Sequence, residues 1–183
     1  MFAIVDPTEI QDWDDQIKEL SRASFFHRVA WARVLKKSYG YTPLYFVNAG
    51  RKLETVIPLM EVSSFLTGKR AVSLPFTDYC EPLAPHNEDS KVLFDAIIRE
   101  GKIRGWKYVE LRGGADYLGD GQASTFYYRH TLNLTPGVEK LFNVLRDSTR
   151  RNIKKAEKEG IEIRFETSLE AMRAFYRRNS LTR

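Results

Sequence analysis

The sequence predicts a mixed α/β fold in which a largely antiparallel sheet is flanked by helices. Three short strand-like runs follow one another between residues 42 and 76, and turn signals separate them. Stretches with apolar residues at helical spacing precede and follow these runs. Hydrophobic residues make up 43% of the 183-residue chain and aromatic residues 13%, which is enough to form a packed core.

The first forty residues predict one strand and two helices. Phe2 to Val5 is an apolar run ended by Asp6-Pro7, which is typical of a short opening strand. A second helix is expected over 24–40, with Lys36 near its end and Gly40 after it. The helix before it shows one apolar face, made of Ile10, Trp13, Ile17 and Leu20.

The middle of the chain predicts an antiparallel meander followed by a crossover. Strands are expected over 42–49, 53–62 and 69–76, and their short connections favour antiparallel pairing. A helix over 88–105 then leads to a buried strand over 106–113. Because a helix between two strands permits parallel pairing, we expect helices on both faces of a mixed sheet.

The C-terminal part predicts a domain boundary. A further strand is expected over 125–134, and Pro136-Gly137 after it indicates that the first domain ends there. The sequence therefore predicts a first domain over 1–137 and the beginning of a second, truncated domain over 138–183.

The predicted second part is a helix, a strand and a helix. One amphipathic helix is expected from Val138 to about Glu159, ended by Gly160, and a strand over 161–167 follows it. Ser168 can cap the last helix. Such a tail is too small for a complete domain, and this is why we expect truncation.

Composition limits the partners and the compartment. The formal charge is +5, from 29 basic and 24 acidic residues, so only local clustering can make an anionic partner a strong prediction. Cys80 is the single cysteine, which excludes an internal disulfide and fits a reducing compartment. Neither a transmembrane run nor a signal-peptide pattern is present, so a cytoplasmic location is expected.

Known catalytic and metal-binding motifs are absent from the sequence. His27, His86 and His130 lie far apart, without the spacing of metal ligands, so no metal site is predicted. His27 and His130 are expected at the edge of the core or on the surface. No neighbouring base is apparent for Cys80, and no nucleophile elbow of a hydrolase occurs. The glycine-rich stretch 112–121 matches no phosphate-binding motif and is interpreted as a loop.

A strongly basic stretch lies between Arg146 and Gly160. On a helix its cations form two neighbouring rows, opposite an apolar face. Two interpretations stay open: a solvated helix face, or a site for a phosphate-bearing ligand or an anionic surface. Nucleic acid is less favoured, because no aromatic residues are interleaved with the charges. The candidate phosphate-binding residues are Arg150, Arg151, Lys154 and Lys155.

A second candidate site is the irregular segment after the third meander strand. Asp78 and Tyr79 follow that strand on a loop that ends in prolines, and such loops often carry binding groups. The alternative is that Asp78 is a turn residue and Tyr79 a packed aromatic residue. Lys36 is a weaker candidate for binding the same anion as the basic stretch. The residues themselves indicate no catalytic residue.

Taken in order, several segments resemble the Fem-type aminoacyltransferases and their relatives in the GNAT (acetyltransferase-like) superfamily. These segments are "FFHRVAW", "YGYTPLYFV", "VIPLMEV", "SLPFTDY" and, most specifically, "TRRNIKKAEKEGIEI". The last is similar to the basic helix that enters the second domain of that family. The resemblance covers essentially the whole chain and implies a GNAT-like first domain followed by the start of another.

The resemblance implies N-acyl transfer. Family members transfer an aminoacyl or acetyl group to a substrate amine, and the cell-wall enzymes among them act on nucleotide- or lipid-linked precursors. It implies a phosphate-bearing small-molecule or lipid-linked substrate, with tRNA as a further partner, and aminoacyl-tRNA or acyl-CoA as the donor. Cys80-Glu81-Pro82 stands where the cell-wall enzymes often have Arg-Gly-Pro, and no pyrophosphate-binding loop occurs. No cofactor is therefore expected in these residues, and this part is expected to be inactive alone.

The alternative to an acyltransferase is a non-catalytic module. It would bind anionic lipid or nucleic acid through the basic residues 146–158. The two hypotheses differ in their response to salt, because purely electrostatic binding weakens steeply as salt is added.

Overall fold

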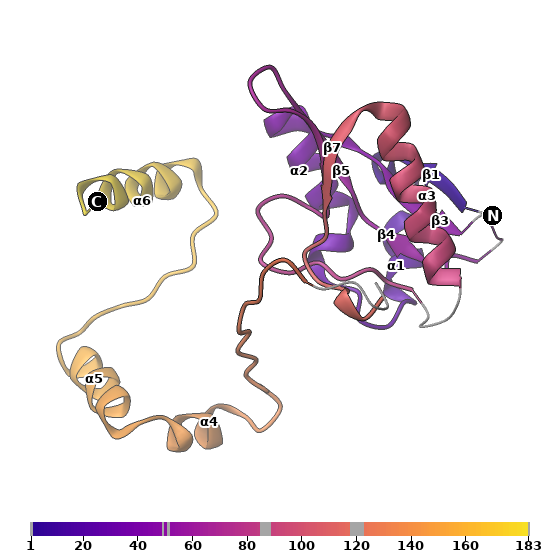
Figure 1. The fold of residues 1–183 in the computed structure, drawn as a ribbon. Helices are drawn as coiled ribbons and strands as arrows, with labels where there is room; N and C mark the ends of the chain where they lie inside the picture. The colour runs from indigo at the N-terminus through magenta and orange to yellow at the C-terminus, as the bar shows by residue number, and fades with distance from the viewer. Residues whose placement is uncertain (1, 49, 51, 85–88, 118–122, 183) are drawn as a thin grey trace. The chain divides into compact units, whose positions relative to one another are not determined.

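The computed structural model describes residues 2–48, 50, 52–84, 89–117 and 123–182. The chain forms two units, Met1–Phe126 and Tyr127–Arg183 (Figure 1). The predicted domain boundary at Pro136-Gly137 stays a prediction.

The described residues of the first unit form two sheets, which are continuous with one another along the chain. The strand orders are β1-β3-β4 and β2-β5-β6-β7, and only β6 and β7 pair in parallel. The Leu44 N–H donates to the Leu59 carbonyl across 2.8 Å, so the two segments remain bonded where one sheet gives way to the other. The strands are β1 (Phe2–Val5), β2 (Thr42–Pro43), β3 (Tyr45–Asn48), β4 (Val56–Ile57), β5 (Met60–Ser64), β6 (Gly68–Val72) and β7 (Trp106–Glu110).

These pairings confirm the mixed, largely antiparallel sheet and the parallel crossover. The predicted meander is present, although each of its first two strands is divided in two, as β2 and β3 and as β4 and β5. Pro58, whose nitrogen cannot donate to a ladder, lies at the second division.

Helices of the first unit precede the meander and form the crossover. The second predicted helix is divided, because the three-residue turn η2 comes before α2. Gly40 ends α2 in the left-handed conformation, at φ 68°, as its predicted capping role requires. The elements are η1 (Pro7–Glu9), α1 (Trp13–Lys18), η2 (Phe25–His27), α2 (Val29–Tyr39), α3 (Asp89–Arg104) and η3 (Ala115–Tyr117).

Two apolar clusters show that helices cover both faces of the sheet. Tyr45 and Val47 of β3 belong to a cluster with α1 and α2, while Phe46 between them belongs to a cluster with α3. This alternation follows from the two-residue period of a strand. In the first cluster the rings of Trp13 and Tyr45 meet edge-on, with centroids 5.6 Å apart.

The strand β7 is less buried than the sequence predicts. Lys107 and Tyr108 are exposed, because among the described residues β7 pairs only with β6 and therefore forms an edge of the sheet. One end of β7 is nevertheless fixed to β5, since Trp106 Nε1 donates to Glu61 Oε2 across 2.6 Å. The expectation of a strand is confirmed, and that of full burial is wrong.

Two further predicted strands do not form. The segments 125–134 and 161–167 are exposed, belong to no helix or strand, and pair with no other strand in the described part of the chain. Their alternating apolar residues favour strand conformation, but a strand also needs a partner for its backbone N–H and C=O groups.

Over residues 127–182 the second unit contains three helices: α4 (Val138–Val144), α5 (Asp147–Lys158) and α6 (Leu169–Leu181). The expected single helix is interrupted at Leu145 and Arg146, which have ψ of 149° and 145°. Asp147, Ser148 and Thr149 then begin α5, and such residues are more favourable in a first turn than inside a helix.

The predicted cap of the last helix is confirmed, because Ser168 Oγ accepts from the Ala171 N–H at 3.1 Å. No residue within 127–182 is buried.

Candidate functional site

The candidate site is built from the two loops that follow the parallel strands β6 and β7. The Ser73 N–H donates to the Glu110 carbonyl across 2.8 Å, and the Cys80 N–H donates to the Arg112 carbonyl across 2.7 Å. The Arg112 N–H donates to Ser73 Oγ at 2.7 Å. Because the strands are parallel, their carboxyl ends meet at one edge of the sheet, which is where open α/β sheets bind ligands.

The loop after β6 has an uncommon backbone. Leu74 and Phe76 adopt positive φ angles of 55° and 64°, a region that non-glycine residues rarely occupy. Thr77 Oγ1 donates to the Leu74 carbonyl across 2.7 Å, and Arg112 Nη1 donates to the Thr77 carbonyl across 2.6 Å. Backbone conformations of this kind are often found at functional sites, where surrounding contacts hold them.

Asp78 and Tyr79 lie on this loop, as the sequence predicts. Asp78 is exposed, and no hydrogen bond or ion pair is recorded for its carboxylate within the described part of the chain. Tyr79 is half-buried and lies against Gly113, where a Cβ atom would come within 2.7 Å of the tyrosine ring. The loop therefore offers one available carboxylate beside an aromatic ring, and its binding role stays a prediction.

Arg22 and Tyr117 belong to the same region, and the sequence gives no local sign of them. Arg22 Nη2 donates to the Tyr117 hydroxyl, and its guanidinium lies 5.9 Å from the centre of that ring. Arg22 Nη1 also lies 3.6 Å from Glu81 Oε2, and the Tyr117 hydroxyl donates to the Ala84 carbonyl at 2.8 Å. These contacts join the segment after α1 to both loops of the site.

His27 and Cys80 form a buried pair beneath the site. The sequence shows no base near Cys80, but in the fold His27 Nε2 lies 3.6 Å from its sulfur. His27 is fully buried rather than at the core edge, and its Nε2 lies 2.9 Å from the Glu81 carbonyl. Since a carbonyl can only accept, Nε2 carries the proton and cannot take one from the thiol.

The thiol of Cys80 also stays protonated. Burial raises its pKa to about 12, and the nearby Glu81 carboxylate adds to this effect. A nucleophilic role would need the thiolate, so the structure makes this pair structural.

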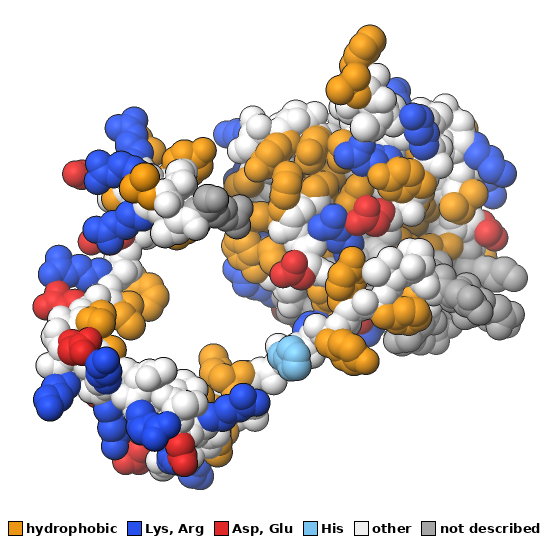
Figure 2. Space-filling view, turned by 60° about the vertical axis from the view of Figure 1, so that its left-hand side comes forward, with side chains coloured by type: hydrophobic (Ala, Val, Ile, Leu, Met, Phe, Trp, Pro, Cys, Tyr) orange, Lys and Arg blue, Asp and Glu red, His pale blue; other side chains and the backbone are white. Residues whose placement is uncertain are grey.

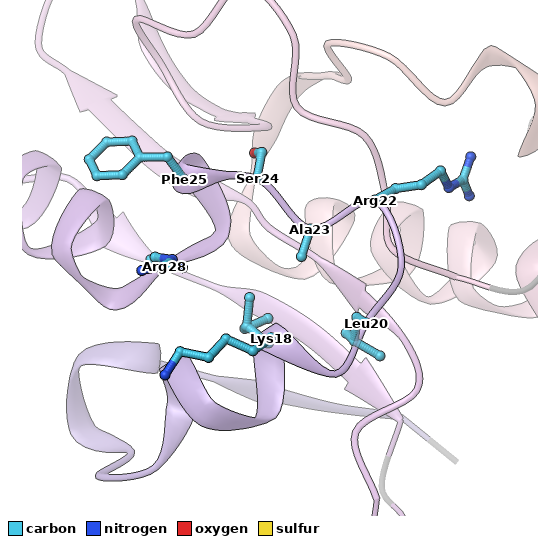
Figure 3. Close-up of a pocket in the computed structure, with 8 residues that line it drawn as sticks. Lys18, Leu20, Arg22, Ala23, Ser24, Phe25 and Arg28 are labelled. Carbon is cyan, nitrogen blue, oxygen red and sulfur yellow. The ribbon is translucent and has the colours of Figure 1, made fainter. Parts of the chain in front are cut away.

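A shallow hollow of about 480 Å³ lies beside the site, at the end of α1 (Figure 3). Its apolar residues include Leu20 and Phe25, and its cations include Lys18 and Arg28. Lys18 is paired with Asp15 at 2.8 Å. Figure 3 shows the side chains of Arg22 and Phe25 pointing in opposite directions.

Lys36 lies in an acidic cluster of the first unit. Its Nζ is 2.7 Å from Asp6 Oδ2 and 3.1 Å from Glu9 Oε1. These hydrogen bonds raise the pKa of Lys36, and the one to Asp6 contributes most. The ammonium thus ties α2 to η1, and its predicted role in binding an anion stays a prediction.

The predicted phosphate-binding residues all lie on α5. Arg150 is paired with Asp147, and Lys155 Nζ lies 3.7 Å from Glu159 Oε1. Arg151 and Lys154 are exposed, with no ion pair or side-chain hydrogen bond recorded for them in the described ranges. Three residues apart on one helix, these two cations are the best placed to meet an anion.

Within the described residues, no cluster of His, Cys, Asp and Glu could hold a metal ion. None of the described helices is both long and apolar enough to cross a bilayer.

Comparisons with known proteins give low similarities. No protein-family model matches the chain, and no curated protein sequence matches it. Among solved structures it is similar to the ribosomal-protein-alanine N-acetyltransferase from Brucella melitensis biovar Abortus 2308, with a TM-score of 0.44 and 12% identity over 72% of this chain and 99% of that one.

Two further solved structures are similar to the same degree. For an acetyltransferase from Trypanosoma brucei the TM-score is 0.42 and the identity 15%, over 72% of this chain and 99% of that one. For a predicted acetyltransferase with acetyl-CoA from Clostridium acetobutylicum the TM-score is 0.43 and the identity 13%, over 75% of this chain and 97% of that one. At these values the similarity assigns neither a family nor an activity to this chain.

Proposed function

We propose that this protein takes part in N-acyl transfer of the Fem/GNAT type, moving an aminoacyl or acetyl group to a substrate amine. The observation that carries the proposal is the parallel β6–β7 pair in an otherwise antiparallel sheet, with Asp78 and Tyr79 on the braced loop at its carboxyl edge. The segment around this loop, "SLPFTDY", is also one that resembles the family.

The chemistry requires a free amine and an activated acyl group. The amine nitrogen attacks the carbonyl carbon, the alcohol or thiol leaves, and the nitrogen loses a proton. The exposed Asp78 carboxylate would hold the acceptor's ammonium group, which must lose one proton to water before its nitrogen can attack; the second proton goes to the leaving alcohol or thiol. Because Cys80 is buried and protonated, direct attack is favoured over an intermediate on a protein thiol.

A separate site for a phosphate-bearing ligand would lie on α5. Arg151 and Lys154 are exposed there and without recorded partners in the described ranges, whereas Arg150 and Lys155 already have carboxylate neighbours. Guanidinium groups can bind phosphate oxygens through two parallel hydrogen bonds, so Arg151 is the first residue to test.

Thermal unfolding with added ligands tests this function. Acetyl-CoA, a UDP-linked muropeptide and inorganic phosphate are the probes, and a specific acyl donor or acceptor should stabilise the fold by about 2.7 kcal/mol at a hundredfold excess over its dissociation constant. Asp78→Asn should remove most of the stabilisation by an amine-bearing acceptor. Asp95→Asn, a change at an exposed position of α3, is the matched control. Absence of stabilisation by every donor and acceptor would sink the proposal.

A second candidate function rests on α5 alone. Its exposed Arg151 and Lys154 also suit a non-catalytic module that binds anionic lipid or nucleic acid. Binding of that kind should fall steeply with salt and show little selectivity among anions, whereas a substrate site should distinguish phosphorylated ligands at constant salt.

A further inference from the structure

The hairpin between β5 and β6 ends in two fully solvent-exposed apolar side chains. Phe65 is 103% exposed and Leu66 87% exposed, the highest values among the large apolar residues of 2–126 that the structure describes. Figure 1 shows this hairpin projecting beyond the rest of the first unit, and Figure 2 shows a projection capped by hydrophobic side chains. Turns are usually built from glycine, asparagine, aspartate or serine, so Phe and Leu at this place need an explanation.

The tip is ordered by its own contacts. Ser64 and Gly68 are the last pair of the ladder, and Gly68 turns with φ of 78°. Arg70 Nη1 donates to Thr67 Oγ1 at 2.9 Å, which ties the last residue of the turn to β6. The two apolar side chains are thus presented by a paired strand end, and little further ordering is needed when they bind.

Cations surround the base of the hairpin. Lys69 is exposed, and Lys107 at the start of β7 lies so close to Gly68 that a Cβ there would come within 3.1 Å of its Nζ. With Arg70 they form a basic collar, defined here as Lys69, Arg70 and Lys107. Residues 62–72 contain no acidic side chain. The one carboxylate of the paired strands β5 and β6, Glu61 of β5, already accepts from Trp106 and lies 3.8 Å from Arg104.

The spacing between tip and collar matches a membrane interface. Lys69 pairs with Ser63, two residues before Phe65, which places the collar about 7 Å behind the tip at the usual rise per strand residue. Interfacial segments bury their apolar side about 5–10 Å into the boundary between headgroups and acyl chains. Phe65 and Leu66 can therefore enter that boundary while the collar stays among the headgroups.

We propose that the β5–β6 hairpin docks this protein on an anionic membrane surface. Phe65 and Leu66 insert into the interface, and the collar binds negatively charged lipid headgroups. The charge of the collar favours an anionic bilayer over an uncharged protein groove. The proposal does not depend on the acyltransferase function, since vesicle binding is measured without any acyl donor.

Sedimentation of the 183-residue protein with lipid vesicles tests the proposal. Vesicles of phosphatidylcholine alone are compared with equal parts of phosphatidylcholine and phosphatidylglycerol. The protein should bind the anionic vesicles more tightly. Phe65→Ser with Leu66→Ser should weaken this binding at least about tenfold, and Lys69→Gln with Lys107→Gln should remove most of the preference for anionic lipid.

Two control variants separate the hairpin from other surfaces. Arg151→Gln with Lys154→Gln removes the same charge from α5, and Tyr127→Ser with Tyr128→Ser removes two aromatic side chains that are 89% and 98% exposed. Each control should change vesicle affinity less than about twofold. If the α5 control loses as much vesicle affinity as the tip variant, the contact lies on α5 and the proposal is overturned. Unchanged binding of the tip variant would also overturn it, and so would a failure of the unaltered protein to bind anionic vesicles.

A fluorophore at the tip gives a second measurement. Leu66→Cys supplies the only exposed thiol among the described residues, because Cys80 is buried. An environment-sensitive dye there should shift to shorter wavelength on anionic vesicles, while the same dye on Ser148→Cys of α5 should not. A shift at Ser148→Cys alone, or at neither position, would also overturn the proposal. Both variants lie at exposed positions, so their melting temperatures should equal that of the unaltered protein.

Discussion

At the scale of single residues, His27 links two of the segments that hold the candidate site. Its Nδ1 accepts from the Ser24 N–H at 3.1 Å, while its Nε2 donates to the Glu81 carbonyl at 2.9 Å. This neutral imidazole therefore joins the turn before α2 to the loop of the site. Protonation would put a second proton on Nδ1 and break the bond from Ser24.

The stability of the fold should therefore fall in mild acid. Burial lowers the pKa of His27 below its ordinary value of 6.5, so the unfolded chain binds the proton first as the pH falls. The free energy of unfolding is unaffected by this group above about pH 7 and decreases as the pH drops below 6.5 towards the folded pKa. Urea unfolding at a series of pH values measures the decrease.

His27→Gln is the control for this prediction. Glutamine can still donate to the Glu81 carbonyl but does not titrate, so the variant should be less stable at neutral pH and should lose this part of the pH dependence. The same slope in His27→Gln and in the unaltered protein would show that another group is responsible.

At the scale of elements, two glycines bring the loop after β7 against the loop after β6. Gly114 has φ of 77°, and a Cβ there would lie 2.5 Å from Pro82 Cδ. Gly113 makes the equivalent approach to Tyr79. The candidate site thus depends on close backbone packing between two loops, as well as on the side chains that they carry.

Gly114→Ala should destabilise the protein more than a matched glycine substitution. Gly105 has φ of 72°, and a Cβ added there would meet no atom within 4 Å, so Gly105→Ala reports only the backbone strain, about 1 kcal/mol. Gly114→Ala adds an overpacked contact of about 1–3 kcal/mol. Urea unfolding of both variants measures the difference, and equal losses would mean that the two loops separate easily.

At the scale of the whole molecule, the core lies entirely in the first unit. Both apolar clusters are made of residues between Phe2 and Leu111, and none of the residues 127–182 is buried. Many apolar side chains of the second unit are instead exposed, such as Phe165 at 99% and Tyr176 at 72%.

A chain of residues 1–126 should fold without the second unit. Its melting temperature should change by less than about 4 °C, which corresponds to less than about 1 kcal/mol for a domain of this size. Calorimetry of both chains measures the shift, and the retained cooperativity of the transition is the control for folding. A larger fall, or loss of the transition, would contradict the conclusion that the core is complete within 1–126.

Local patterns in the sequence by themselves determined much of the fold. The short apolar runs of the meander strands, the glycine after α2 and the serine before α6 act over a few residues, so they can be recognised without knowledge of the rest of the chain. They predicted the order of strands and helices as far as β7, with the antiparallel meander and the parallel crossover. They also located Asp78 and Tyr79 on the loop after β6, although the binding role of these residues stays a prediction.

Only the tertiary structure decided which segments meet. Arg22 reaches Tyr117 across 95 positions of the chain, and His27 lies beside Cys80 across 53. In the described part of the chain, the tertiary structure also leaves 125–134 without a strand partner and places β7 at a sheet edge. The physical reason is that local pattern sets the preference of a segment, whereas pairing and burial depend on the surfaces that the folded chain brings within contact distance.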